Sequence, residues 1–173
     1  MRIAGLALSL LICTHAHADI LGLKLKMTEA EAKAAKLCKA PVADTAKYTL
    51  TCKSVAFAGT KMDVELWIPK PGLAKIGMST KIGAARKEAE AKADAILEKL
   101  TATYGKVEMT GNGELSNSAP LFDNVDKTFA RFKHTAATMF TVDDPPDKTM
   151  RLIGKVIHDT AGYWMTLSFV PHA

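Results

Sequence analysis

Aromatic residues are scarce in this chain, and after residue 18 there is no long apolar run. Phenylalanine, tryptophan and tyrosine together make up 6% of the 173 residues. A membrane-spanning helix needs about 18 or more consecutive apolar residues, and no stretch beyond the N-terminal segment approaches that length. The hydrophobic share of 48% is ordinary for a globular protein and permits a buried core. We therefore predict one globular domain with no stable membrane span.

Familiar signatures of catalysis are also lacking after residue 18. The chain contains no G-x-S-x-G nucleophile elbow and no S-x-x-K motif. It contains no H-x-H or H-E-x-x-H spacing there that would suggest a zinc site. The Gly-Asn-Gly segment at 111–113 leads into neither a helix pattern nor a lysine, so it does not fit a phosphate-binding loop. The sequence predicts no cofactor and no metal, and we expect a protein that is not an enzyme.

Cysteine is limited to three residues, of which Cys13 lies in the N-terminal segment. Cys38 and Cys52 have neither the C-x-x-C spacing of a redox pair nor the neighbouring ligands of a metal site. In an oxidising compartment two such thiols pair. Closing the loop between them would stabilise the fold by about 3 kcal/mol. We predict a structural disulfide between Cys38 and Cys52.

The N-terminus has the pattern of an export signal. Residues 1–13 begin with a positive charge and continue as an apolar run, and Ala16-His17-Ala18 provides the small residues of a cleavage site. We expect cleavage after Ala18 and a periplasmic or secreted mature protein. A lipoprotein with Cys13 as the lipid-bearing residue is the alternative, but Ile12 stands where a small residue is usual.

Basic residues exceed acidic residues only modestly. The full chain carries a net charge of +5, and loss of Arg2 with the signal would leave 22 basic and 18 acidic residues, or +4. These charges are spread along the chain rather than gathered into the basic stripe of a nucleic-acid-binding protein. We therefore expect no nucleic-acid partner, while the positive excess favours an acidic partner or an anionic envelope surface.

Residues 80–104 form the most clearly periodic stretch of the sequence. Apolar side chains recur there at spacings of three and four, with Lys and Glu on the opposite side, as on one face of an α-helix. Ser79 or Thr80 is the predicted N-cap, and Gly105 is the predicted C-terminal stop. Because the stripe is narrow and rich in alanine, we expect the helix to lie close to a sheet. The apolar positions are Ile82, Ala85, Ala89, Ala93, Ile96, Leu97, Leu100 and Tyr104.

The chain before this helix reads as a short helix and a β-hairpin. A capping-box pattern at Thr28-Glu29-Ala30-Glu31 starts a helix that we expect over 28–39. Strands are predicted over 47–57 and 61–68. A bulge is predicted at Lys53-Ser54, because the apolar alternation changes phase there.

Strands dominate the chain after the long helix. We predict a short strand over 106–110, a polar surface loop over 114–126, and strands over 128–142, 150–157 and 163–170. Sequential strands with short connections favour an antiparallel meander.

The predicted fold class is therefore α+β: a short helix and β-hairpin, then a long helix packed on an antiparallel β-meander. We expect a single domain over 19–173, with possible sub-units 19–72 and 73–173. A weak internal sequence similarity supports the sub-units. The two predicted helices are preceded by similar segments, Gly22-Leu23-Lys24-Leu25-Lys26-Met27-Thr28 and Ile76-Gly77-Met78-Ser79.

The first of these leads, followed by a short helix and strands, resembles a known pattern. It is similar to small secreted bacterial α+β domains of the beta-lactamase-inhibitor-protein and outer-membrane-assembly-lipoprotein type. The resemblance covers Gly22–Lys39 and, more loosely, Ile76–Ala84. It implies a domain that works by binding other proteins, and no binding residue carries over from it.

Few side chains suggest chemistry. His134 lies within a predicted strand, and His158 lies at a strand end beside Asp159. Either could serve a small periplasmic hydrolase as a base with an orienting carboxylate, which requires the groups to converge in a cleft. An acidic turn lacks the ligand pattern of a calcium loop, and we interpret it as a rigid polar turn. That turn contains Asp143, Asp144 and Asp147.

Surface aromatics define the predicted binding site. Trp67 shares the polar side of its strand with Glu65, and Trp164 alternates with Tyr163 on the last strand. Trp and Tyr are common anchors in protein interfaces, although Trp164 also fits a sheet covered on both faces. We predict that Trp67, Tyr163 and Trp164 mark an interface for another envelope or secreted protein, as in an inhibitor, an immunity protein or an envelope accessory. A small apolar-ligand binder is a further alternative, which needs a cavity between helix and sheet.

Overall fold

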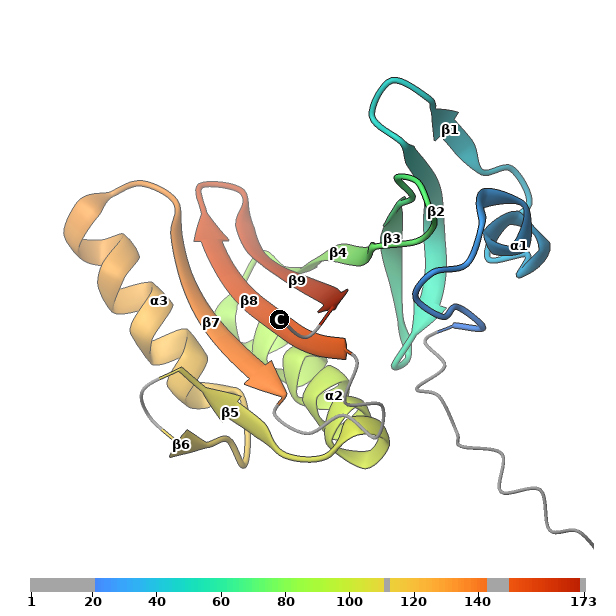
Figure 1. Ribbon diagram of the computed structural model, residues 1–173. Helices are drawn as coiled ribbons and strands as arrows, with labels where there is room; N and C mark the ends of the chain where they lie inside the picture. The colour runs from blue at the N-terminus through green and yellow to red at the C-terminus, as the bar shows by residue number, and fades with distance from the viewer. Residues whose placement is uncertain (1–20, 111–112, 143–149, 172–173) are drawn as a thin grey trace, which may run out of the picture.

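The computed structural model describes residues 21–110, 113–142 and 150–171, which form a mixed α+β fold (Figure 1). Their strands belong to one antiparallel sheet of nine strands, in the order β1-β2-β3-β4-β9-β8-β7-β5-β6. The predicted α+β class with an antiparallel sheet is confirmed. The predicted signal segment, Cys13 and the acidic turn at 143–147 lie outside the described residues.

Along the chain, three groups of strands are separated by α2 and α3, and α1 precedes the first group. The helices are α1 (Glu29–Ala34), α2 (Arg86–Tyr104) and α3 (Ala119–Phe132). The strands are β1 (Val42–Asp44), β2 (Thr49–Phe57), β3 (Thr60–Trp67), β4 (Lys75–Gly83), β5 (Val107–Met109), β6 (Gly113–Glu114), β7 (Ala136–Val142), β8 (Met150–Asp159) and β9 (Gly162–Pro171).

The first helix has the predicted capping box but is shorter than predicted. The Thr28 hydroxyl accepts a hydrogen bond from the Glu31 N–H, and the Glu31 carboxylate accepts one from the Thr28 N–H at 2.7 Å. The helix ends at Ala34, well before residue 39, and Lys36 follows with a φ of 52°. A residue in this left-handed region closes a helix, so α1 stops within two turns.

The β2–β3 hairpin carries the predicted bulge and the predicted disulfide. The register shifts between Cys52 and Val55. Within this bulge the Ser54 N–H donates to the Asp63 carboxylate at 3.2 Å, which satisfies a backbone group that the ladder leaves free. Cys38 is bonded to Cys52. The disulfide therefore ties the segment after α1 to β2.

The long helix starts later than predicted, because its expected first turn is part of a strand. Residues 75–83 form β4, which pairs with β3 on one side and β9 on the other. The N-cap of α2 is Ala85, which makes no side-chain capping bond, so the prediction of Ser79 or Thr80 is wrong. β4 joins the N-terminal strands to the part of the fold that carries α2 and α3 (Figure 1).

A helix, α3, occupies the region where a loop and the start of a strand were predicted. It spans Ala119–Phe132, and β7 begins only at Ala136. The predicted loop over 114–126 and the predicted start of a strand at 128 are therefore wrong. Leu121, Phe122 and Val125 are buried at helical spacing, and a proline lies in the first turn, where helices accept it. The Asp and Asn residues between these apolar positions made the segment resemble a loop.

Both long helices lie on the same side of the sheet (Figure 1). α2 contacts β4 and β9, while α3 contacts β7 and β8. Strands β7, β8 and β9 form the predicted antiparallel meander. The long helix predicted to cover it is α2, but β7 and β8 are covered mainly by α3. Packing on this side is tight, because a Cβ on Gly154 would overlap the ring of Phe140.

Candidate functional site

The side of the sheet opposite α2 and α3 carries no packed helix within the described part of the chain (Figure 1). Strand alternation sets its composition, since buried residues alternate with exposed or half-buried ones along most of β3, β4 and β9, and the buried ones point to the opposite side of the sheet. We call this surface the open face. Its side chains include Thr51, Lys61, Asp63, Glu65, Trp67, Lys75, Gly77, Ser79, Lys81, Met139, Lys155, Trp164, Thr166 and Ser168.

A hollow of about 270 Å³ lies in the open face over β3, β4 and β9. It exists because small residues occupy neighbouring positions of β4 and β9, with Gly77 opposite Ser168 and Ser79 opposite Thr166. Long side chains surround these small ones. We call this feature the Gly77 hollow; its lining includes Lys53, Glu65, Trp67, Lys75, Gly77, Ser79, Thr166 and Ser168.

The three predicted interface residues are divided between the two sides of the sheet. Trp67 is 44% exposed and lines the Gly77 hollow. Trp164 is half-buried on the open face, with Lys81 Nζ 6.0 Å from the centroid of its ring. Tyr163 is only 6% exposed and packs on Phe122 beneath α3. Because adjacent residues of a strand point to opposite sides, Tyr163 cannot belong to the surface that carries the two tryptophans.

The open face has more basic than acidic side chains that are free of partners. Lys53 Nζ lies 2.7 Å from Asp63 Oδ2, and this hydrogen bond holds the pKa of Asp63 below its ordinary value. No ion pair joins Lys61, Lys75 or Lys155 to another residue of the described ranges. The face therefore presents positive charge around its central hollow.

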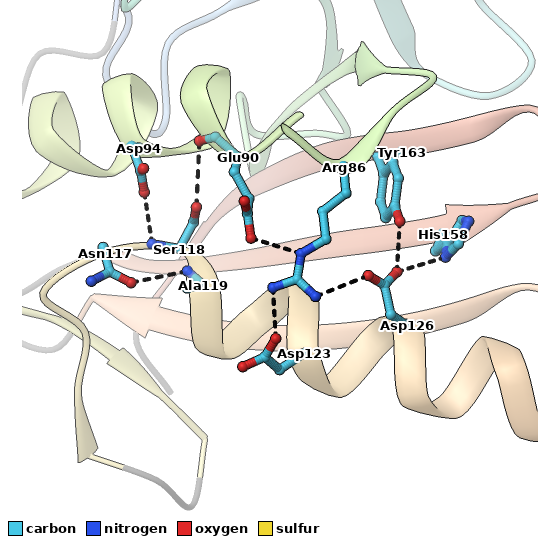
Figure 2. Close-up of polar contacts among 10 residues, drawn as sticks. All are labelled: Arg86, Glu90, Asp94, Asn117, Ser118, Ala119, Asp123, Asp126, His158 and Tyr163. Atoms are coloured by element: carbon cyan, nitrogen blue, oxygen red, sulfur yellow. Dashed lines mark hydrogen bonds and ion pairs between the residues drawn. The ribbon is translucent and has the colours of Figure 1, made fainter. Parts of the chain in front are cut away.

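A polar cluster joins both long helices to the sheet on the covered side (Figure 2). Arg86, the first residue of α2, contacts Glu90 at 2.8 Å and reaches two carboxylates of α3, Asp123 at 2.6 Å and Asp126 at 3.3 Å. The Tyr163 hydroxyl donates to Asp126 at 2.7 Å. Hydrogen bonds to Asp123 and then Glu90 raise the pKa of Arg86 above its ordinary value. The cluster therefore fixes the start of α2 to the middle of α3.

The two candidate histidines have different surroundings and different partners. His158 lies between the rings of Phe129 and Tyr163, at centroid distances of 4.0 and 4.1 Å. Its Nδ1 is 2.9 Å from Asp126 Oδ1, although the ring is not oriented for a hydrogen bond to that oxygen. His134 instead stacks on Phe132 at 5.6 Å. The structure thus gives His158 a carboxylate neighbour, and neither histidine lines the Gly77 hollow.

Sequence reasoning missed the carboxylates of this cluster because their segment was expected to be a loop. On a helix, residues three apart lie on the same face. Asp123 and Asp126 therefore point together only once α3 is recognised. The helical spacing of Leu121, Phe122 and Val125 was the signal that could have revealed it.

A larger cavity of about 370 Å³ lies beside the N-terminal strands rather than between α2 and the sheet. Its walls include Tyr48, Leu50, Ile68 and Pro69, with Asp44 as one of its polar residues. Asp44 is itself paired with a neighbouring lysine at 3.4 Å. This cavity does not occupy the position that the apolar-ligand alternative required.

The described ranges also bear on a metal site and on a membrane-spanning helix. Their His, Cys, Asp and Glu side chains form no group of three or more that could hold a metal ion. None of their helices has the length and apolar character of a membrane-spanning segment.

Comparisons with known proteins leave the family open. No protein-family model matches the chain, and no curated protein or solved structure matches it either. The resemblance to secreted binding domains therefore stays a prediction.

Proposed function

We propose that this chain is an exported, non-enzymatic protein that binds another envelope or secreted protein through the open face. The observation that carries the proposal is the uncovered open face with the Gly77 hollow beside the exposed Trp67. Protein interfaces concentrate their binding energy in such aromatic anchors and in the pockets that receive them. The disulfide between Cys38 and Cys52 supports an oxidising compartment.

The lining of the hollow and the edges of the sheet also support binding through the open face rather than catalysis. The hollow is lined by serine, threonine and glycine together with long side chains. Within the described residues, none of its serine or threonine hydroxyls hydrogen-bonds to a basic side chain that could activate it as a nucleophile. The two edges of the sheet are short, since β1 has three residues and β6 has two. β1 covers only Thr49–Thr51 of β2, and a bulge between Cys52 and Val55 interrupts the outer edge of β2 beyond it. Short and bulged edges discourage pairing with another strand, so the open face rather than an edge is the surface offered to a partner.

Site-specific photocrosslinking in the source cells tests this proposal. A photoreactive amino acid at Met139, which is 41% exposed on the open face opposite Lys155, is expected to form a discrete adduct with one protein. The same amino acid at Lys99, exposed on α2, serves as the matched control and is expected to form none. Adducts of equal yield from both positions, or from Lys99 alone, would contradict the proposal, as would the absence of any adduct.

A small hydrolase is the second candidate, and it rests on the 2.9 Å contact between His158 and Asp126. A carboxylate can orient a histidine that acts as a general base, but the His158 ring would first have to rotate to hydrogen-bond to Asp126. Ester and amide hydrolysis by purified protein that is lost in His158→Ala would favour this candidate. No turnover by the wild-type protein on the same substrates would remove it.

A further inference from the structure

The Gly77 hollow has a construction that suits one inserted side chain. Its volume of about 270 Å³ lies below the roughly 300–1,000 Å³ of sites that bind drug-sized ligands. Trp67 supplies one wall and is 44% exposed. Aromatic rings pair favourably with one another in stacked or edge-to-face arrangements. An aromatic side chain of a partner therefore has both the space and a ring to contact.

The charges around the hollow select the chemistry of the chain that carries that side chain. Lys75 lines the hollow, and Lys155 lies directly opposite Thr166 in the β8–β9 pair. Both lysines lack an ion pair with the described residues, whereas Asp63 is already neutralised by Lys53 at 2.7 Å. Glu65 is then the one acidic side chain of the hollow without such a partner. A partner with carboxylates next to its aromatic residue would be complementary to this surface.

We propose that the Gly77 hollow receives an aromatic side chain from an acidic segment of the partner protein. This inference rests on the proposed function and deepens it, because it names the chemistry of the partner and the point of insertion. The aromatic ring packs over Gly77 against Trp67, and the flanking carboxylates contact Lys75 and Lys155.

Gly77 allows a test that fills the hollow without disturbing the fold. Its φ lies outside the left-handed region, and a Cβ built on it would meet only the Glu65 carbonyl oxygen, at an ordinary 3.6 Å. Valine is favoured in strands, so Gly77→Val should fold as the wild-type protein does. Ala137→Val is the matched control, because Ala137 is exposed on the same side of β7, away from the hollow.

The probe is a fluorescein-labelled peptide, Asp-Asp-Trp-Glu-Asp, whose binding is measured by fluorescence polarisation. We expect saturable binding to the wild-type protein and to Ala137→Val, and binding at least about tenfold weaker to Gly77→Val and to Lys75→Glu. Peptides with Ala in place of Trp, or with Lys in place of the acidic residues, should also bind at least about tenfold more weakly.

Equal affinity of the peptide for Gly77→Val and the wild-type protein would overturn the inference. Equal binding of the alanine peptide, or no saturable binding at millimolar peptide, would do the same. Dextran sulfate that binds more tightly than the peptide, with no loss in Gly77→Val, would assign the face to a polyanion instead.

Crosslinking separates a failure of this inference from a failure of the proposed function. A protein adduct from Met139 that persists undiminished in the Gly77→Val background would preserve the proposed function and overturn the inference. Absence of any adduct in the wild-type background would remove the proposed function itself.

Discussion

At the residue scale, Asp126 of α3 is the residue that brings its own helix into contact with three other elements. Its carboxylate accepts a hydrogen bond from Tyr163 of β9, contacts Arg86 of α2 and lies beside His158 of β8. A carboxylate that is withdrawn from water needs such partners, because burying an unpaired charge is costly. Asp126 therefore links the covered side of the sheet to the polar sides of both long helices.

Tyr163→Phe should destabilise the fold at neutral pH, and the effect should shrink at high pH. Burial first, and then the hydrogen bond to Asp126, raises the pKa of Tyr163 from 10.0 to about 12. A group with a raised folded-state pKa contributes stability that is complete below its unfolded pKa and is lost as pH rises through the folded pKa. The difference in unfolding free energy between wild type and Tyr163→Phe should therefore be about 1.5 kcal/mol up to about pH 9.5. It should decline between pH 10 and 12.

Urea unfolding at pH 7, 9 and 11 measures this difference directly. Tyr48→Phe is the control, because Tyr48 is an exposed residue beside the N-terminal cavity. A difference for Tyr163→Phe that stays constant up to pH 11 would contradict the assignment of the raised pKa to the buried hydroxyl.

At the element scale, the placement of α3 depends on polar contacts with α2. Arg86 bridges from α2 to two residues one turn apart on α3, and the Ser118 N–H, just before α3, donates to Asp94 of α2 at 2.7 Å. These contacts join the helices at two places (Figure 2). Packing of the apolar face of α3 then has one defined position on β7 and β8.

Arg86→Ala should loosen this attachment. Because the Arg86 side chain is 38% exposed and that of Asp123 is 70% exposed, solvent screens the pairs, and we expect a loss of only about 1–2 kcal/mol in unfolding free energy. Lys92→Ala is the matched control, since Lys92 pairs with Glu88 four residues away on the same helix. That loss should be clearly smaller than for Arg86→Ala, because the pair is solvent-exposed and joins two residues of one helix. Thermal and urea unfolding measure both variants, and equal losses would show that Arg86 has no special role between the helices.

At the scale of the whole molecule, β4 and β9 form the centre of the sheet. Each is paired on both sides, and together they join the N-terminal strands to the meander. The edges are the short strands β1 and β6. Stability in such a fold should be distributed from the centre outwards.

Native-state hydrogen exchange tests this distribution. Amide protons of β4 and β9 should exchange most slowly, at rates set by global unfolding, whereas those of β1 and β6 should exchange fastest through local opening. Reduction of the disulfide should accelerate exchange mainly in β1 and β2. Faster exchange in β4 than in β1 would show that the two ends of the sheet unfold independently.

Much of the local structure could be predicted from sequence. In the candidate site, the exposed Trp67 could be predicted, whereas the hollow around Gly77 could not. Strand alternation correctly assigned Trp67 to the polar side of its strand and placed Trp164 on the side opposite Tyr163, and the capping box at Thr28 was readable from four residues. Gly77, by contrast, was visible only as part of a lead into a helix. Its importance comes from its neighbours on β3 and β9, which are distant in sequence.

Residue types and spacings within a few residues were enough to predict the disulfide pair, the alternation of β2, β3 and β9, and the apolar stripe of α2. Contacts between segments far apart in the chain settle that 119–132 is a helix, that Tyr163 is covered while Trp67 is exposed, and that Asp126 meets Tyr163 across 37 residues of chain. The physical reason is that a segment with mixed local signals is settled by the apolar surface it can bury. That surface is created by strands far away along the chain.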